Sequence, residues 1–189
     1  MSDWTNHVER WKDCQDCALG CQRSRIVLAR GAIPCDVLFV GEAPGVSEDA
    51  LGQPFVGPAG KLLDKVIEAA RVPIGETRWL WSYAFTNLVA CFPREAKATG
   101  DHQPAPDEIK ACRQRLKEFV KLARPRLIVC VGTLARDWLD PKRRESLDLG
   151  LPQVSIVHPA FILRMPEVAQ SGEIKRCILR IKNASKELV

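Results

Sequence analysis

The chain has 189 residues, 46% of them hydrophobic and 27% charged, a size and composition that indicate one compact domain spanning residues 1–189 and exclude a disordered chain. No apolar run approaches the ~18–20 residues of a membrane-spanning helix, and the first residues lack the apolar segment of a secretory signal, so we expect a cytoplasmic protein without a membrane partner. The net charge of +5 favours a polyanionic partner.

The chain begins with a short helix and a cysteine pair. Trp4 and Trp11 lie on one face of a helix expected over residues 3–12. Cys14 and Cys17 follow, and this C-x2-C spacing lets two thiolates bind one metal centre from a tight turn. Because disulfides are rare in a reducing compartment, we expect some of the eight cysteines to be metal or cluster ligands.

The first buried strand leads into the stretch around which the chain is organised. Residues 36–40 form a continuous apolar run typical of a strand in a parallel sheet. The loop GEAPG then places Glu42 directly after this strand, and GQPFVGPAG places Phe55 before a predicted helix. Ligands of open α/β sheets bind where strands end, so we expect both side chains at the mouth of such a site. A turn rich in Gly and Pro for backbone reasons alone is the alternative.

The middle of the chain supplies a second strand, a long loop and a helix. An aromatic-rich run at residues 79–90 predicts the strand, which delivers Asn87 and is followed by Cys91. Residues 92–106 carry three prolines and no apolar period, which indicates a loop of a length that is often functional. Asp107 is expected to cap the amphipathic helix that follows.

The C-terminal part continues the alternation of strands and helices. A third strand is predicted at residues 126–132, a helix at 133–139, a fourth strand at 153–160 that ends near His158, and an amphipathic helix at 173–188. Strands that alternate with helices predict an α/β fold with a parallel sheet covered on both faces.

Three strand ends carry polar side chains that a parallel sheet brings to one edge. Glu42 follows the first strand, Asn87 the second and His158 the last. A carboxylate, an amide and an imidazole therefore converge on one cleft, with Phe55 beside them. Each residue also has a plain interpretation: a packed histidine, a turn-forming asparagine or a core phenylalanine.

Taken together, the motifs resemble the uracil-DNA glycosylase superfamily, and most closely its iron-sulfur members, known as family 4. The resemblance rests on GEAPG with PFVGPAGKLLD, on TNLVACFP, EIKAC and LIVCVG, and on HPAFILR, in the expected order over nearly the whole chain. It implies a three-layer α/β/α sandwich with a central four-stranded parallel sheet. It also implies a [4Fe-4S] cluster and a monofunctional DNA repair hydrolase that removes uracil from DNA and leaves an abasic site for base excision repair.

The family pattern assigns the cluster ligands to Cys14, Cys17, Cys91 and Cys112. A zinc ion held by the same four cysteines is the alternative, because four thiolates suit both centres. In either case the metal is expected to tie the cysteine-bearing N-terminal segment, residues 1–35, to the core. The other four cysteines are not assigned as ligands.

The resemblance also implies roles in the chemistry. Gly41, Phe55, Asn87 and His158 would bind the flipped uracil, with the phenyl ring stacked on the base and the asparagine amide matching a carbonyl oxygen and a ring N–H. His158 would donate a hydrogen bond to the departing base anion. Glu42 would either stabilise the sugar cation or orient the attacking water, and the sequence leaves both roles open.

The segment after His-Pro is expected to enter the DNA helix in this family. Either Leu163 or Ile162 would be the apolar wedge that fills the space of the flipped base, and Arg164 would bind a phosphate. Lys61, at the start of a helix, is a further phosphate ligand, with a merely solvated lysine as the alternative. Ala160 replaces the usual serine, which removes a hydroxyl that could bind a phosphate.

Two other functions stay open at this point. The long loop carries His102 at a place that resembles a branch of the superfamily that traps uracil-DNA covalently through a histidine, although the basic run that precedes it there is missing here. A relative that acts on another modified base is the other alternative. We expect a monomer, and a sliding clamp is a candidate protein partner.

Overall fold

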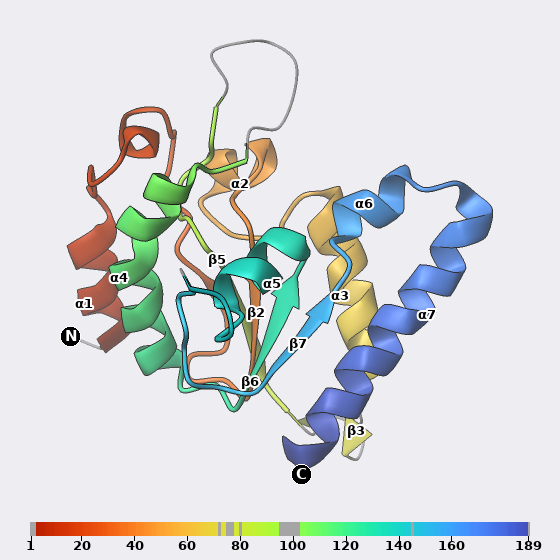
Figure 1. Cartoon of the computed structure of the whole chain (residues 1–189). Coiled ribbons are helices and arrows are strands. Elements are labelled where there is room, and N and C mark those ends of the chain that lie inside the picture. The colour runs from red at the N-terminus through yellow and green to blue at the C-terminus, as the bar shows by residue number, and fades with distance from the viewer. Residues whose placement is uncertain are drawn as a thin grey trace.

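The structure is a computed structural model that describes residues 3–71, 73–74, 78–79, 81–94, 103–144 and 146–188, with the backbone alone at 73–74 and 78–79. Its centre is a five-stranded sheet in the order β1-β5-β2-β6-β7 (Figure 1). Four of these strands run parallel, namely β5 (Tyr83–Asn87), β2 (Val37–Gly41), β6 (Leu127–Val131) and β7 (Gln153–Ile156). The predicted four-stranded parallel sheet is therefore confirmed.

A fifth strand extends the sheet at one edge. Strand β1 (Arg30–Gly31) pairs antiparallel with β5, so that Arg30 lies opposite Phe85. A strand of two residues has no apolar period, which is why the sequence pattern did not indicate it. A separate short hairpin is formed by β3 (Pro73–Ile74) and β4 (Arg78–Trp79).

Helices cover both faces of the sheet, as Figure 1 shows. The α-helices are α1 (Asp3–Trp11), α2 (Val46–Leu51), α3 (Pro58–Ala70), α4 (Pro106–Ala123), α5 (Thr133–Leu139), α6 (Pro159–Arg164) and α7 (Glu167–Ala184). Two 3-10 helices are also present, η1 (Ala18–Cys21) and η2 (Ser185–Leu188).

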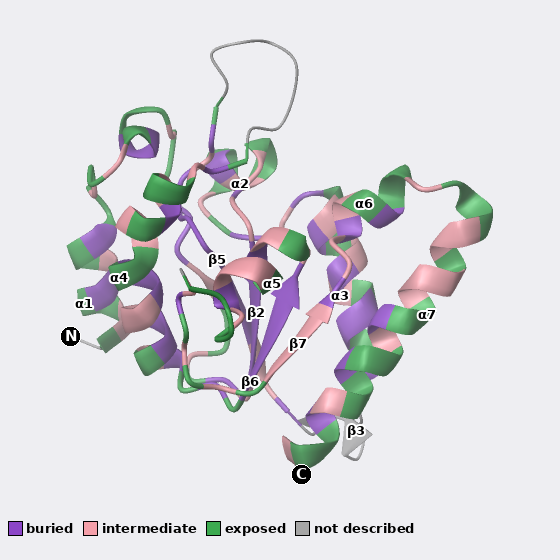
Figure 2. Cartoon of the chain, in the orientation of Figure 1, coloured by how far each residue is buried: buried purple, intermediate pink, exposed green. Residues whose placement is uncertain are grey.

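Successive residues of the central strands point to opposite faces, and both faces are buried. In β2, Val37 and Phe39 pack with residues of α3, α6 and α7, while Leu38 and Val40 pack with residues of α4 and α5. All five residues of β2 and of β6 are buried, and Figure 2 shows these strands as a buried centre between helices with exposed outer faces. The expected three-layer sandwich is therefore confirmed.

Two helix starts differ from the prediction. Asp107 does not cap α4, so that prediction is wrong: the helix begins at Pro106, and Oε2 of Glu108 accepts a hydrogen bond from the backbone N–H of Ala105 at 2.7 Å. Helix α7 begins at Glu167, earlier than the predicted start at residue 173. None of residues 167–172 is buried, so the sequence shows no apolar period there from which to predict a helix. No helix in the described ranges is long and apolar enough to cross a membrane.

Helix α1 packs on α4 through a buried histidine. His7 is 5% exposed and its ring stacks on Trp4, with ring centroids 5.7 Å apart. Its Nδ1 lies 4.0 Å from Oε2 of Glu118, which also accepts a hydrogen bond from Nε1 of Trp11 at 2.8 Å. Burial, together with the charge of Arg115, lowers the pKa of His7 to about 4.

This histidine should make stability depend on pH. Between pH 6.5 and about 4 the unfolded chain binds a proton at His7 that the folded chain does not, so the free energy of unfolding falls as the pH is lowered. At ~1.4 kcal/mol per pKa unit, we expect the loss from this residue to reach up to ~3 kcal/mol.

The check is urea unfolding of the wild type and of His7→Phe across this pH range. Phenylalanine keeps the ring packing and removes the titration, and Nε2 of His7 has no hydrogen-bond partner among the described residues that the change would leave unpaired. Equal pH slopes for the two proteins would show that His7 does not titrate in this way.

Candidate active site

A pocket of about 800 Å³ opens at the carboxyl ends of the parallel strands. Glu42, Phe55, Asn87 and His158 all line it, so the structure brings together the four side chains that the strand ends predicted. Its volume lies in the range of small-molecule sites, ~300–1,000 Å³. Because the four residues come from three different strand ends and one loop, their convergence depends on the parallel register of the sheet.

Asn87 and Phe55, which line the pocket, both pack closely against Gly41. Gly41 and Asn87 lie opposite each other at the ends of β2 and β5. A Cβ atom added to Gly41 would lie 2.4 Å from Oδ1 of Asn87 and 2.5 Å from Cζ of Phe55. A glycine is therefore required here, since any side chain would displace the amide and the ring.

Asn87 is fixed from behind by a buried arginine. Arg115 of α4 is 1% exposed and donates hydrogen bonds to the backbone oxygens of Asn87 and Leu88, at 2.6 and 2.8 Å, and to Oγ1 of Thr86 at 2.8 Å. Three hydrogen bonds from one rigid guanidinium hold the end of β5 and the residue after it in place. The side-chain amide of Asn87 is thereby positioned through its own backbone.

His158 is the N-cap of helix α6. Its Nδ1 accepts a hydrogen bond from the backbone N–H of Ala160 at 3.2 Å, so in the neutral ring the proton lies on Nε2, which is then a donor. The Cβ position of Gly132, whose φ is +96°, lies 3.2 Å from Cβ of His158, so that the imidazole packs where a side chain would otherwise stand. The centroid of the Phe55 ring lies 6.4 Å from that of the imidazole.

Glu42 is half-buried and lines the pocket directly after β2. The loop that carries it is tied to the segment after β5, because the backbone oxygens of Gly41 and Glu42 accept from the N–H groups of Leu88 and Val89, at 2.9 and 3.3 Å. These two hydrogen bonds join the chain just beyond the ends of β2 and β5. The carboxylate sits on the extension of the sheet rather than on an independent loop.

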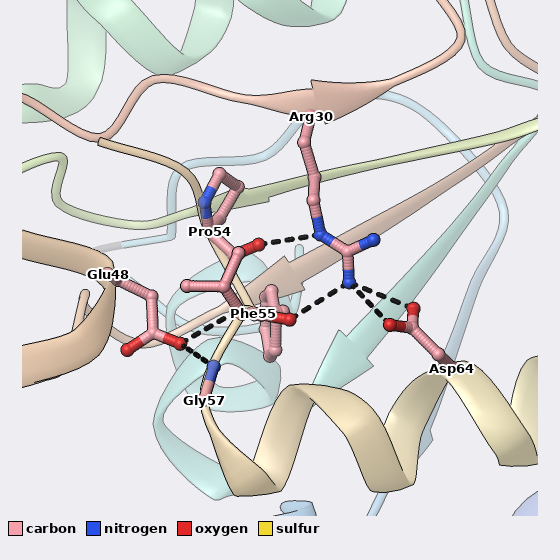
Figure 3. Close-up of polar contacts among 7 residues, drawn as sticks. Arg30, Glu48, Pro54, Phe55, Gly57 and Asp64 are labelled. Atoms are coloured by element: carbon pink, nitrogen blue, oxygen red, sulfur yellow. Dashed lines mark hydrogen bonds and ion pairs between the residues drawn. The ribbon is translucent and has the colours of Figure 1, made fainter. Parts of the chain in front are cut away.

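Phe55 sits on a loop in an unusual backbone conformation. Its φ of 57° lies in the left-handed region, which is costly for a bulky residue. The ring is 6% exposed and packs on Phe85 with centroids 5.4 Å apart. Arg30 and Glu48 bind the backbone on either side of this residue, as Figure 3 shows. The loop is therefore held by side chains from two other parts of the chain.

Among the described residues, three basic side chains line the pocket. Arg136 of α5, Arg164 of α6 and Arg180 of α7 all line it. Of these the sequence analysis singled out only Arg164, because the other two lie inside helices whose exposed faces are generally charged. Lys61 is exposed near the start of α3, outside the residues that line the pocket.

Of residues 160–166, expected to enter DNA as a loop, 160–164 belong instead to the short helix α6. Ile162 is 1% exposed and packs in the core with α3 and α7, so burial removes it as the apolar wedge. Leu163 is 43% exposed and stays a candidate. Phe161, which is not among the predicted site residues, is 54% exposed and lines the pocket. His102 lies outside the described residues.

The four predicted metal ligands line a second, smaller cavity of about 20 Å³. They come from three separate segments: Cys14 and Cys17 before η1, Cys91 after β5, and Cys112 in α4. Within the described ranges, no three His, Cys, Asp or Glu side chains are arranged to hold a metal ion. Burial raises the pKa of the Cys91 thiol to about 11, against the lowering effect of the nearby arginine at position 23.

Two arginines make this cavity suitable for an anionic group. Nη1 of Arg23 donates to Sγ of Cys91 at 3.4 Å. Arg115 also lines the cavity, and its buried Nε has no hydrogen-bond partner among the described residues. The ion pairs of the described residues do not include Arg115 either. A buried guanidinium without a carboxylate is costly, and a centre with four thiolates, which is net negative, would compensate it. In charge and donor type the residues present therefore fit such a centre, while the described side chains are not arranged around a metal position.

A buried carboxylate connects the cysteine-bearing segment to the pocket. Asp49 is 2% exposed and accepts hydrogen bonds from the backbone N–H of Ser24, at 2.8 Å, and from Nη2 of Arg94, at 2.7 Å. Burial alone would raise its pKa, but these hydrogen bonds lower it below the ordinary value. Asp49 belongs to α2, between the GEAPG loop and Phe55, so the N-terminal segment and the pocket loop are packed as one unit.

The doubly covered parallel sheet and its pocket define an α/β protein with a carboxylate, an amide and an imidazole around one aromatic ring. A sequence profile described as the Uracil DNA glycosylase superfamily matches residues 29–182. The match covers most of the chain, so the protein belongs to this superfamily.

Individual relatives agree with this assignment. The chain is 31% identical to the type-4 uracil-DNA glycosylase of Pyrobaculum aerophilum, over 87% of this chain and 86% of that protein. It is 29% identical to the type-4 enzyme of Archaeoglobus fulgidus, over 92% and 89% of the two chains, and 27% identical to that of Thermotoga maritima, over 96% and 92%.

The close packing of the pocket loop on α3 predicts a large effect of one methyl group. A Cβ atom at Gly60 would lie 1.8 Å from the backbone oxygen of Phe55, so Gly60→Ala must displace backbone. We expect the variant to lose ~1–3 kcal/mol of unfolding free energy in denaturant titrations.

Gly172→Ala is the matched control. It lies inside α7 with its nearest outside atom, in the flexible side chain of Arg176, 4.0 Å from the added Cβ, so it should be neutral or stabilising by up to ~1 kcal/mol. Equal stability of the two alanine variants would contradict the described packing of the loop.

Proposed function

We propose that this protein is a uracil-DNA glycosylase that hydrolyses the N-glycosidic bond of uracil in DNA and leaves an abasic site. The observation that carries the proposal is the convergence of Glu42, Phe55, Asn87 and His158 on one pocket in a member of this superfamily. Relatives named type-4 uracil-DNA glycosylases, similar over most of the chain, support it.

Recognition of the base falls to Asn87 and Phe55. The asparagine side chain offers an N–H to a carbonyl oxygen and an oxygen to a ring N–H, a pattern that uracil presents and cytosine does not. The phenyl ring provides a surface on which the flipped base stacks, worth ~1–3 kcal/mol by general aromatic-to-base values. Together they return part of the free energy needed to take the base out of the helix.

His158 acts on the leaving group. As the glycosidic bond breaks, negative charge grows on the departing base. With Nδ1 engaged by the N–H of Ala160, the neutral imidazole presents the Nε2 proton, and a hydrogen bond from it to a base oxygen strengthens as that charge grows. Because the ring also caps α6, it is held ready before substrate binds.

Glu42 acts on the sugar side of the bond. A carboxylate at the end of β2 is placed to stabilise positive charge that develops on the sugar, or to orient the water that attacks it. Both roles need an ionised carboxylate, so both predict that the Glu42→Gln variant releases uracil more slowly than the wild type. We propose no covalent step for this residue.

We assign the DNA contacts to the rim of the pocket. Arg136, Arg164 and Arg180 would bind phosphates on either side of the flipped nucleotide. Leu163, exposed on α6, would fill the space that the base leaves, and Lys61 is a further phosphate contact on α3. A monomeric state and a sliding-clamp partner stay predictions.

We propose that Cys14, Cys17, Cys91 and Cys112 hold a [4Fe-4S] cluster, with zinc as the alternative metal. The support is the donor set itself, which lines one cavity beside Arg115 and Arg23. When bound, the centre would supply a covalent link between the N-terminal segment, the segment after β5 and α4. The chain's own residues carry out the bond cleavage.

The roles of Asn87 and His158 are tested by uracil release from a uracil-containing oligonucleotide, read as strand scission after alkali. The wild type should act with many turnovers. Asn87→Ala and His158→Gln each remove a hydrogen bond that strengthens in the transition state and should lower kcat by ~10²–10³-fold. Lys121→Ala, an exposed residue at the end of α4, is the control and should keep wild-type activity.

A denaturing protein gel of the same reactions separates the alternatives. A heat-stable adduct at one protein per oligonucleotide, lost in His102→Ala, would replace the glycosylase by a covalent trap. Full activity of Asn87→Ala would remove the proposed recognition of uracil. No release of uracil but release of another deaminated base would reassign the substrate.

The proposed metal site is tested by the iron content and the absorbance of the purified protein. Purified wild type should contain ~4 irons per chain and absorb in the thiolate-to-iron charge-transfer region. Cys112→Ser should lose both signals, because it removes one ligand.

Cys21→Ser is the matched control for the metal site. Cys21 is exposed and does not line the cavity, so its replacement should retain all the iron. One zinc and no iron in the wild type would establish the alternative metal, and loss of iron in Cys21→Ser would overturn the ligand assignment.

A further inference from the structure

The base-stacking residue has a backbone that does not hold itself in place. Phe55 combines a bulky side chain with a φ of 57°, a conformation that such residues adopt only when their surroundings enforce it. It lies outside any helix or strand, between α2 and α3. The direction of its ring toward the pocket therefore depends on whatever fixes this conformation.

Arg30 holds the backbone from the edge of the sheet. Its Nε donates to the backbone oxygen of Pro54 at 2.7 Å, and its Nη2 donates to that of Phe55 at 2.9 Å (Figure 3). The same guanidinium forms an ion pair with Asp64 of α3 at 2.8 Å and lies over the ring of Phe85, 4.0 Å from its centroid. Arg30 does not line the pocket, so any effect on a substrate there must pass through the residues that it holds, of which Phe55 lines the pocket.

Glu48 holds the same loop from the other side. Its Oε1 accepts from the backbone N–H groups of Val56 and Gly57, at 2.9 and 2.8 Å (Figure 3). Its Oε2 accepts from the backbone N–H of Gly45 at 3.1 Å. Glu48 also lines the pocket, but both of its carboxylate oxygens are engaged with backbone amides. One side chain joins the GEAPG loop to the residues after Phe55.

The two side chains bind opposite kinds of group on consecutive peptide units. Arg30 takes the carbonyl oxygens of residues 54 and 55, and Glu48 takes the N–H groups of residues 56 and 57. These four groups flank the left-handed residue on both sides. Rotation of the backbone at Phe55 would break hydrogen bonds to both partners, and each of them is charged, which makes such bonds strong.

We infer that Arg30 and Glu48 are positioning residues that set the ring of Phe55 for stacking on the flipped uracil, an inference that rests on the proposed function. A purely structural role would make the same contacts but would change only stability. A positioning role instead requires that the catalytic effect of Arg30 pass through the phenyl ring.

The test is a double-mutant cycle between Arg30→Met and Phe55→Ala, with kcat/KM for uracil release measured alongside denaturant unfolding. Methionine keeps the length of the side chain and removes all the donors. Arg30→Met should lower kcat/KM about tenfold or more, the size expected for a misplaced stacking surface. In the Phe55→Ala background the same change should have almost no further effect.

Additive losses in the cycle would overturn the inference, and so would full activity of Arg30→Met. Asp64→Asn is the control, since it removes the carboxylate charge and leaves both carbonyl contacts of Arg30 possible. It should retain most activity, and a loss equal to that of Arg30→Met would assign the effect to the ion pair instead.

Hydrogen exchange of the peptide over residues 52–62 gives a readout independent of uracil release. Glu48→Gln and Arg30→Met should both speed exchange there, because each frees this loop. Unchanged exchange in both variants would contradict the inference even if the protein is an active glycosylase. If both variants exchange faster but the wild type releases no uracil, the proposed function fails while the positioning of Phe55 stands.

Discussion

The parallel register of β5, β2, β6 and β7 is the constraint on which the site depends. Because these strands end at one edge, residues far apart in the chain become neighbours there, and Gly41 lies opposite Asn87. The hydrogen bonds from Leu88 and Val89 to the backbone oxygens of Gly41 and Glu42 carry this pairing past the last strand residues. The positions of the pocket side chains at the strand ends are therefore set by sheet geometry before any loop is considered.

Two buried charged side chains, Asp49 and Arg115, differ in how their charge is compensated. Asp49 is buried but receives hydrogen bonds from the backbone of Ser24 and from Arg94, so its negative charge is compensated inside the protein. Arg115 has only neutral acceptors among the described residues and stands beside four thiols. The positive charge of Arg115 is therefore not compensated by a carboxylate among the described residues, which is the physical reason to expect an anionic centre at the cysteine cavity.

The sequence was a good guide to whatever lies at a strand end. Glu42, Asn87 and His158 could be predicted because apolar runs mark strands clearly and the next polar residue marks the edge. Arg115 could not be, since a charged residue within an amphipathic helix gives no signal that it points inward. Ile162 and Leu163 are neighbours in a short apolar segment, so only the packing of α6 on the core could tell which is buried and which is exposed.

The capping of α6 by His158 has a consequence for the order of events on DNA. The imidazole is joined by its ring nitrogen and its backbone to the helix that carries Leu163 and Arg164. Insertion of the leucine and binding of a phosphate would press on the same rigid unit that holds the imidazole. Lesion search and bond cleavage would then share one element, because any displacement of α6 on DNA would also move the imidazole that caps it.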